Sequence, residues 1–301
     1  MTAAWGLLAL VWADAKAAEG YPVTRRIETF PADTCADDRL PALAGAWIVG
    51  CRAGDRPDTA VSILTGEIVP LPSPPVSTTL AEGRLFAPGL GQGPRALPDG
   101  APDPAAPYTK PDLVAPPAYD GVHVALATED HIEAYALGDH RWNRTDAAPV
   151  PGVSPALAWP RVVWVQSDPT TGLDLWTRDA ADQARPFRVA PGDQTLPVGD
   201  GAHLAWVDDG NVILWDSTNE TRLPADTGFA APLTLSDGVV CWEDRAAWKA
   251  RGGALDDVDG IDIHCSDGRG VTGPGDQRWP SRWGPWLLYR VGATVFLAGP
   301  A

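Results

Sequence analysis

Short apolar runs alternate with polar turns along this chain, most clearly in two successive copies of one pattern. The first copy has its apolar runs at 154–157, 161–165, 173–176 and 186–189, and the second at 195–198, 203–207, 211–215 and 220–223. The runs are rich in β-branched and aromatic residues, and turn residues such as Asp209-Gly210 separate them. This combination is typical of antiparallel hairpins. Each copy therefore predicts four short strands.

The same pattern extends along most of the chain. The turn between the first and second strand of each unit is expected at Gly45, Gly83, Gly121, Pro160, Gly201, Gly238 and Gly284. The spacing averages about 40 residues, as in four-stranded propeller blades. We therefore predict an all-β chain with a single seven-bladed β-propeller over residues 22–299, with six blades as the alternative. Residues 89–117, dense in Pro and Gly, show no clear third strand for the second blade.

The two ends of the chain complement each other. The last unit supplies strands only near 279–281, 286–291 and 294–298, so that its fourth strand is missing. Residues 26–33 resemble the fourth-strand segment at 220–226. We expect an N-terminal strand to complete the last blade, which would leave neither terminal blade with an unpaired edge in the ring.

Charge and the N-terminal segment bear on partners and location. The net charge of −16 repels phosphate backbones and anionic lipid surfaces, so nucleic acid is not an expected partner. Residues 1–17 combine a short apolar run with Ala15-Lys16-Ala17, which predicts a signal peptide, the alternative being a disordered apolar terminus. No stretch is long enough to span a membrane as a helix. We expect a monomer that is secreted or periplasmic.

The four cysteines of the chain favour a protein that is exported from the cytoplasm. Cys241 and Cys265 lie on neighbouring predicted strands and are expected to pair, and Cys35 and Cys51 can pair in the same way. No metal-site spacing occurs, which favours two disulfides in an oxidising compartment. The alternative is four buried free thiols in a cytosolic protein.

Motifs that carry catalysis are scarce. We find no nucleophile elbow, zinc-protease pair, phosphate loop or redox cysteine pair. The histidines are scattered over different hairpins, where a structural role is favoured, although a cluster across blades stays open; they are His123, His131, His140, His203 and His264. Asp257, Asp259 and Asp262 surround a Gly turn and could hold calcium, but a solvated hairpin turn is favoured. We expect no cofactor.

The tryptophans divide into two groups. Trp47, Trp164, Trp206 and Trp242 recur just after the first turn of their units and are expected in the core between blades. Others fall outside this register and are the better surface candidates. We predict Trp248, Trp279, Arg282 and Trp283 as binding residues, with Arg282 between two rings of an exposed aromatic ledge.

The repeats resemble the TolB-like, or PD40-type, WD40-like β-propeller family over about residues 22–299. The likeness lies in Ser154-Pro155, Val162-Val163-Trp164, Gly172-Leu173-Asp174-Leu175-Trp176 and Gly260-Ile261-Asp262-Ile263. The resemblance implies an envelope protein whose propeller binds protein partners, but this chain lacks room for a separate N-terminal α/β domain. We predict a non-enzymatic propeller that binds an unidentified protein. The alternative is an extracellular glycan-binding protein or enzyme with its site at the channel mouth.

Overall fold

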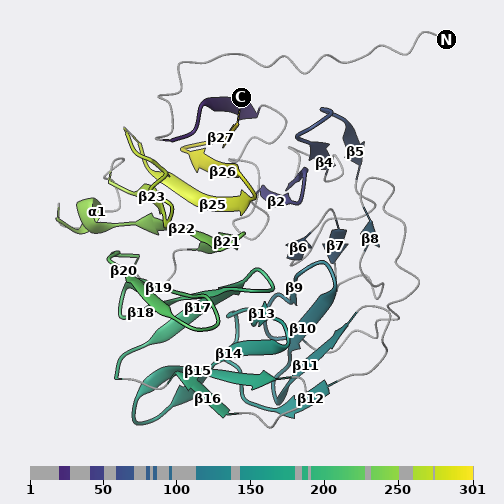
Figure 1. The fold of residues 1–301 in the computed structure, drawn as a ribbon, viewed down its shortest axis with the longest axis vertical. Helices are drawn as coiled ribbons and strands as arrows, with labels where there is room; N and C mark the ends of the chain where they lie inside the picture. Colours follow the sequence, from purple (N-terminus) through teal and green to yellow (C-terminus); the bar gives the residue numbers. More distant parts are fainter. Residues whose placement is uncertain are drawn as a thin grey trace.

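The computed structural model is built from small antiparallel sheets that stand side by side around a common centre (Figure 1). It describes residues 20–27, 41–50, 59–70, 79–81, 84–86, 95–96, 113–136, 143–179, 185–188, 191–227, 232–250, 260–273 and 275–300. In this part of the chain the short helix α1 (Ala246–Ala250) follows β22. None of the described helical residues form a segment long and apolar enough to cross a membrane.

The described strands form six sheets of four strands and one sheet of three. Consecutive strands pair within each sheet, except that β1 (Val23–Ile27) joins the last sheet; some of the connections are tight turns, such as Asp209-Gly210. From the innermost strand outward, the first three sheets are β2 (Ala42–Ala44), β3 (Trp47–Gly50), β4 (Thr59–Ser62) and β5 (Ile68–Pro70); β6 (Thr79–Ala81), β7 (Arg84–Phe86) and β8 (Arg95–Ala96); and β9 (Ala118–Tyr119), β10 (His123–Ala127), β11 (His131–Ala136) and β12 (Asn143–Asp146). The next two sheets are β13 (Ala156–Ala158), β14 (Arg161–Asp168), β15 (Gly172–Asp179) and β16 (Arg185–Arg188); and β17 (Gln194–Gly199), β18 (Leu204–Asp208), β19 (Asn211–Trp215) and β20 (Glu220–Leu223). The last two sheets are β21 (Leu233–Ser236), β22 (Val239–Asp244), β23 (Asp262–Cys265) and β24 (Gly270–Val271); and β25 (Gln277–Trp283), β26 (Trp286–Val291), β27 (Thr294–Gly299) and β1 (Val23–Ile27). The third strand of the second unit, which the sequence did not indicate, is β8.

The innermost strands hold the sheets together. Each contacts the innermost strand of the next sheet, in the order β2, β6, β9, β13, β17, β21, β25 and back to β2. Side-chain hydroxyls make some of these contacts specific. Thr234 Oγ1 accepts a hydrogen bond from the Arg282 amide at 2.9 Å, and Ser281 Oγ accepts one from the Leu43 amide at 2.8 Å. Contacts between innermost strands thus link each described sheet to the next.

An N-terminal strand completes the last sheet, as predicted. β1 pairs antiparallel with β27, from Val23 opposite Gly299 to Ile27 opposite Val295. The segment lies earlier than expected: only Arg26 and Ile27 of the predicted segment fall within it, and residues 28–33 lie outside the described residues. The prediction relied on likeness to another strand, whereas in the described strand Ile27 is the residue that joins an apolar core cluster.

The hydrophobic core lies between neighbouring sheets. Trp164, Trp206 and Trp242 are 1%, 1% and 5% exposed, which confirms that these recurring tryptophans belong to the core. Trp206 of β18 packs against Val165 of β14 in one apolar cluster, so that an indole fills the space between two sheets. Trp47 is half-buried.

A disulfide joins β22 and β23. Cys241 and Cys265 lie directly opposite each other in the strand register and form the predicted bond. Cys35 and Cys51 lie outside the described residues.

The buried side chain of Tyr289 affects the stability of the folded protein at alkaline pH. Tyr289 is 3% exposed, and burial raises the pKa of its phenol from 10.0 to about 12. The folded state therefore favours the neutral phenol, so this stabilisation is complete below pH 10 and is lost as the pH rises to about 12. We expect Tyr289→Phe, which cannot ionise, to lessen the loss of unfolding free energy over this range by about 2 kcal/mol in urea titrations. An unchanged alkaline profile would contradict this assignment.

Candidate binding site

β25 separates the aromatic residues that were predicted to form one ledge. Trp279 lies near its start and Trp283 at its end, which puts their backbones about 13 Å apart at the rise of an extended strand. Trp283 packs against the apolar cluster that contains Ile48 and Leu288. Both indoles are half-buried. The prediction of a continuous exposed ledge is therefore wrong.

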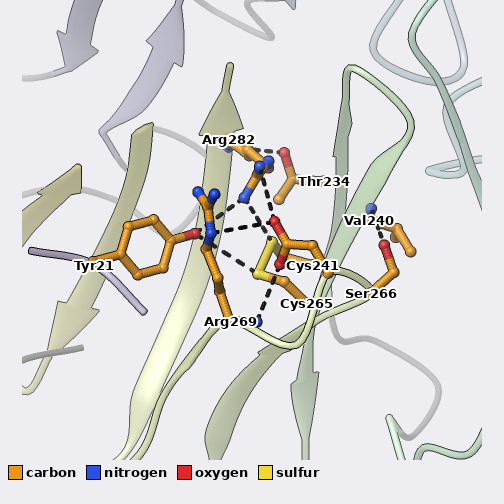
Figure 2. Close-up of a disulfide and its surroundings, with 9 residues drawn as sticks. Tyr21, Thr234, Val240, Cys241, Cys265, Ser266, Arg269 and Arg282 are labelled. Atoms are coloured by element: carbon orange, nitrogen blue, oxygen red, sulfur yellow. Dashed lines mark hydrogen bonds and ion pairs between the residues drawn. A yellow bond between two sulfur atoms is a disulfide. The ribbon is translucent and has the colours of Figure 1, made fainter. Parts of the chain in front are cut away.

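Arg282, the cation of the predicted ledge, lies inside the protein. Its side chain is 4% exposed and donates to Tyr21 Oη at 3.0 Å and to Asp267 Oδ2 at 3.3 Å, beside the Cys241–Cys265 disulfide (Figure 2). Burial raises the pKa of the Tyr21 phenol, although the charge of Arg282 opposes this effect. Arg282 thus ties the N-terminal segment to the disulfide-bonded sheet and is not available to a ligand.

A repeated backbone motif positions Trp279. The sequence Gly-Asp-Gln-x-x-Pro occurs at 192–197 and again at 275–280. In both copies the innermost strand is bulged, and the residue before Pro has a positive φ, 52° at Leu196 and 59° at Trp279. The Asp of each copy accepts a backbone hydrogen bond from the preceding sheet, Asp193 from Leu173 and Asp276 from Ile261. Because a bulge redirects a side chain, this motif sets where the Trp279 ring lies.

The Trp279 backbone also holds a buried carboxylate. Glu243 of β22 is 0% exposed, and its Oε1 accepts a hydrogen bond from the Trp279 amide at 2.7 Å. Its Oε2 accepts one from Arg245 Nη2 at 3.1 Å and lies 3.7 Å from Arg278 Nε. Glu243 is therefore paired with two guanidinium groups and one backbone amide at the junction of two sheets.

The repeat itself shows that the fold does not require this charge. Glu243 follows the core residue Trp242, and the corresponding residues after Trp164 and Trp206 are Val165 and Val207. Both valines are buried and pack toward the next sheet, as Glu243 does. Taking a carboxylate out of water costs several kcal/mol, which pairing only partly offsets. An apolar residue serves the same position elsewhere, so the charge points to a role beyond packing.

The outer side of this cluster combines cationic and aromatic surface. The Arg278 side chain is 38% exposed, and its guanidinium lies over the Trp279 ring, 5.6 Å from the ring centroid. Trp279 and Arg290 also line a small recess whose remaining walls are Pro41, Leu288, Tyr289 and Val295. We call Glu243, Arg245, Arg278, Trp279 and Arg290 the β22–β25 site.

The helix α1 begins directly beyond this site. Asp244 caps it, accepting a hydrogen bond from the Ala246 amide at 2.9 Å. Lys249 of α1 forms an ion pair with Asp226. The structure thus brings the helix that contains Trp248 and the Trp279 end of β25 to the same edge of the sheets. The Trp248 side chain itself lies outside the described part of the chain.

The described histidines considered as candidate catalytic residues lie on different turns and strands and make local contacts. His123 and His203 bond through Nδ1 to Asp120 and Asp200 of their own turns, and His123 stacks on Trp159 at 3.9 Å. His131 contacts Glu133 at 2.9 Å and Asp130; the hydrogen bond from His131 lowers the pKa of the Asp130 carboxyl. These contacts are structural.

The predicted calcium site falls mostly outside the described residues. Asp257 and Asp259 belong to residues 251–259, which the structure does not describe, and Asp262 lies at the start of β23. Among the residues that are described, no group of three or more His, Cys, Asp or Glu side chains could hold a metal ion.

Sequence reasoning missed Glu243, Arg245, Arg278 and Arg290. Two signals could have found them. One was the Glu in a repeat position that holds Val after Trp164 and Trp206, and the other was the second copy of the Gly-Asp-Gln-x-x-Pro motif with Arg-Trp in the variable positions.

Comparisons with known proteins identify the fold. No family model and no curated protein matches this chain. Among solved structures, a chain of the mitotic checkpoint complex is 10% identical, covering 98% of both chains, with a TM-score of 0.58. The Swd1 β-propeller domain from Myceliophteria thermophila is 11% identical over 93% of this chain and all of that domain, with a TM-score of 0.53. The β-propeller domain of the Trilobed protease from Pyrococcus furiosus is 8% identical over 86% of this chain and 92% of that domain, with a TM-score of 0.55. The chain is a β-propeller.

A pair of variants tests the energetics of the β22–β25 site. Glu243→Gln leaves Arg245 and Arg278 without their anion, so we expect a loss of about 2–3 kcal/mol of unfolding free energy in urea. The double variant R278T/W279L converts residues 275–280 into the sequence of residues 192–197, Gly-Asp-Gln-Thr-Leu-Pro, which already forms the same bulge. The double variant should lose no more than about 1 kcal/mol of unfolding free energy. Equal losses in both variants would contradict the assignment.

Proposed function

We propose that this chain is a non-enzymatic, seven-bladed β-propeller of the TolB-like kind that binds a protein through the β22–β25 site. The observation that carries the proposal is the buried Glu243 cluster beneath Trp279, in a position where two other sheets carry valine. Large aromatic and arginine side chains supply most of the binding energy in protein interfaces. The buried carboxylate would hold Arg278 in place before binding, which lowers the cost of ordering it.

The site also meets the geometric needs of an interface. It lies where one sheet ends and the next begins, on the edge from which α1 extends. Loops and strand ends on a rigid scaffold are the usual location of binding residues. The alternative of a glycan site or an enzyme at the channel mouth has less support, because His123, His131 and His203 each bond to a carboxylate within three positions in the sequence.

Affinity capture tests the binding function. The tagged protein would be incubated with extracts of its source organism, and retained proteins identified by mass spectrometry. We expect a discrete, salt-resistant partner that R278T/W279L no longer retains. Leu64→Ser is the matched control, because Leu64 is 69% exposed on a different sheet. Absence of any partner, or equal retention by R278T/W279L, would exclude this function for the site.

We further propose that the protein works in the periplasm or outside the cell, with residues 1–17 as its signal peptide. The Cys241–Cys265 disulfide supports this, because such bonds persist in oxidising compartments. Alkylation of free thiols during lysis, followed by peptide mapping, should leave both cysteines unmodified until a reductant is added. Alkylated Cys241 and Cys265 in the native protein would contradict export.

A further inference from the structure

The β22–β25 site contains three arginines, Arg245, Arg278 and Arg290. Arg278 and Arg290 lie directly opposite each other on β25 and β26. Like charges in this position repel, which destabilises the sheet unless an anion lies nearby. Glu243 compensates one charge, but it also pairs with Arg245. Two guanidinium groups therefore share one carboxylate, and the third, that of Arg290, lies on the strand position opposite Arg278.

Other nearby carboxylates are directed elsewhere. Asp244 accepts the α1 capping hydrogen bond from Ala246, and Asp276 accepts the amide of Ile261. Arg290 donates a hydrogen bond to the carbonyl oxygen of Gly292, and no described carboxylate forms an ion pair with it.

The guanidinium groups leave hydrogen-bonding capacity on the outer side. A guanidinium has five N–H donors in a planar fork that matches a carboxylate. Arg278 reaches Glu243 through Nε, and among the described residues its two terminal nitrogens have no hydrogen-bond partner. Because the side chain is 38% exposed, these nitrogens can bind an incoming anion.

A partly exposed aromatic ring lies next to this charge. Trp279 is half-buried and the Arg278 guanidinium lies over its ring, so that an apolar side chain can contact the exposed part of the indole beside the guanidinium group. We propose that the site recognises a carboxylate adjoining an apolar side chain in an acidic segment of a protein partner. This inference depends on the proposed binding function and names the chemistry of its partner.

Defined peptides test this chemistry. The probes are fluorescein-labelled hexapeptides with amidated C-termini: Gly-Gly-Glu-Phe-Gly-Gly, the same peptide with Gln for Glu, and the same peptide with Gly for Phe. Binding is measured by fluorescence anisotropy. We expect the Glu-Phe peptide to bind at least about tenfold more tightly than either of the others, since a charge-assisted pair and an apolar contact are each lost.

Variants assign the preference to the site. R278T should abolish the preference for Glu over Gln, W279L should weaken the preference for Phe over Gly, and Leu64→Ser should change neither. Circular dichroism would confirm that each variant is folded. Equal binding of the Glu and Gln peptides, no detectable binding, or a preference that survives in R278T would overturn the inference.

The peptide and capture experiments together distinguish a failure of the carboxylate inference from a failure of the proposed binding function. If a captured partner is lost in R278T/W279L but the peptides show no charge preference, the binding function stands and the carboxylate inference is wrong. If no partner is captured and no peptide binds, both are wrong.

Discussion

Contact between neighbouring innermost strands is the constraint on which the rest of this structure depends. Between β21 and β25 and between β25 and β2, a side-chain oxygen of one strand accepts a hydrogen bond from a backbone amide of the other, at Thr234 and Ser281. The turns continue the pattern, since Asp200 accepts the Gly238 amide at 2.7 Å. Small polar residues are needed there, and apolar residues are needed between the sheets. The strand ends are under neither requirement, so they can vary.

The β22–β25 site lies where these requirements are relaxed and a local rule is broken. A buried carboxylate replaces the valine of other repeats, and a tryptophan adopts a positive φ, which is rare for a bulky residue. The equivalent Leu196 adopts a similar φ of 52° but packs against an apolar cluster. The backbone motif is thus part of the architecture, whereas the Arg-Trp pair that it carries in the last sheet is particular to this site.

The sequence was sufficient for most of the fold because its information is periodic. Strands β19, β20 and β26 begin and end where the apolar runs predicted, and the Cys241–Cys265 pair followed from strand order. The second sheet was harder, because two-residue β8 has no apolar alternation to detect. The site was hardest. Arg282 looked like a surface residue because charge usually implies exposure, and its partner Tyr21 lies 261 positions away. Such a long-range pair leaves no local signal.

The pairing of β1 with β27 has a consequence for how the protein is made. Six sheets are built from consecutive strands and can form as the chain leaves the ribosome, but the last sheet needs residues from both ends. β1 is synthesised before its partner β27, and more than 260 residues separate the two strands in the sequence. Joining distant segments is slow, because the entropy of closing a long loop opposes it. Until β27 has been synthesised, the nascent chain therefore lacks the strand pair that completes the last sheet.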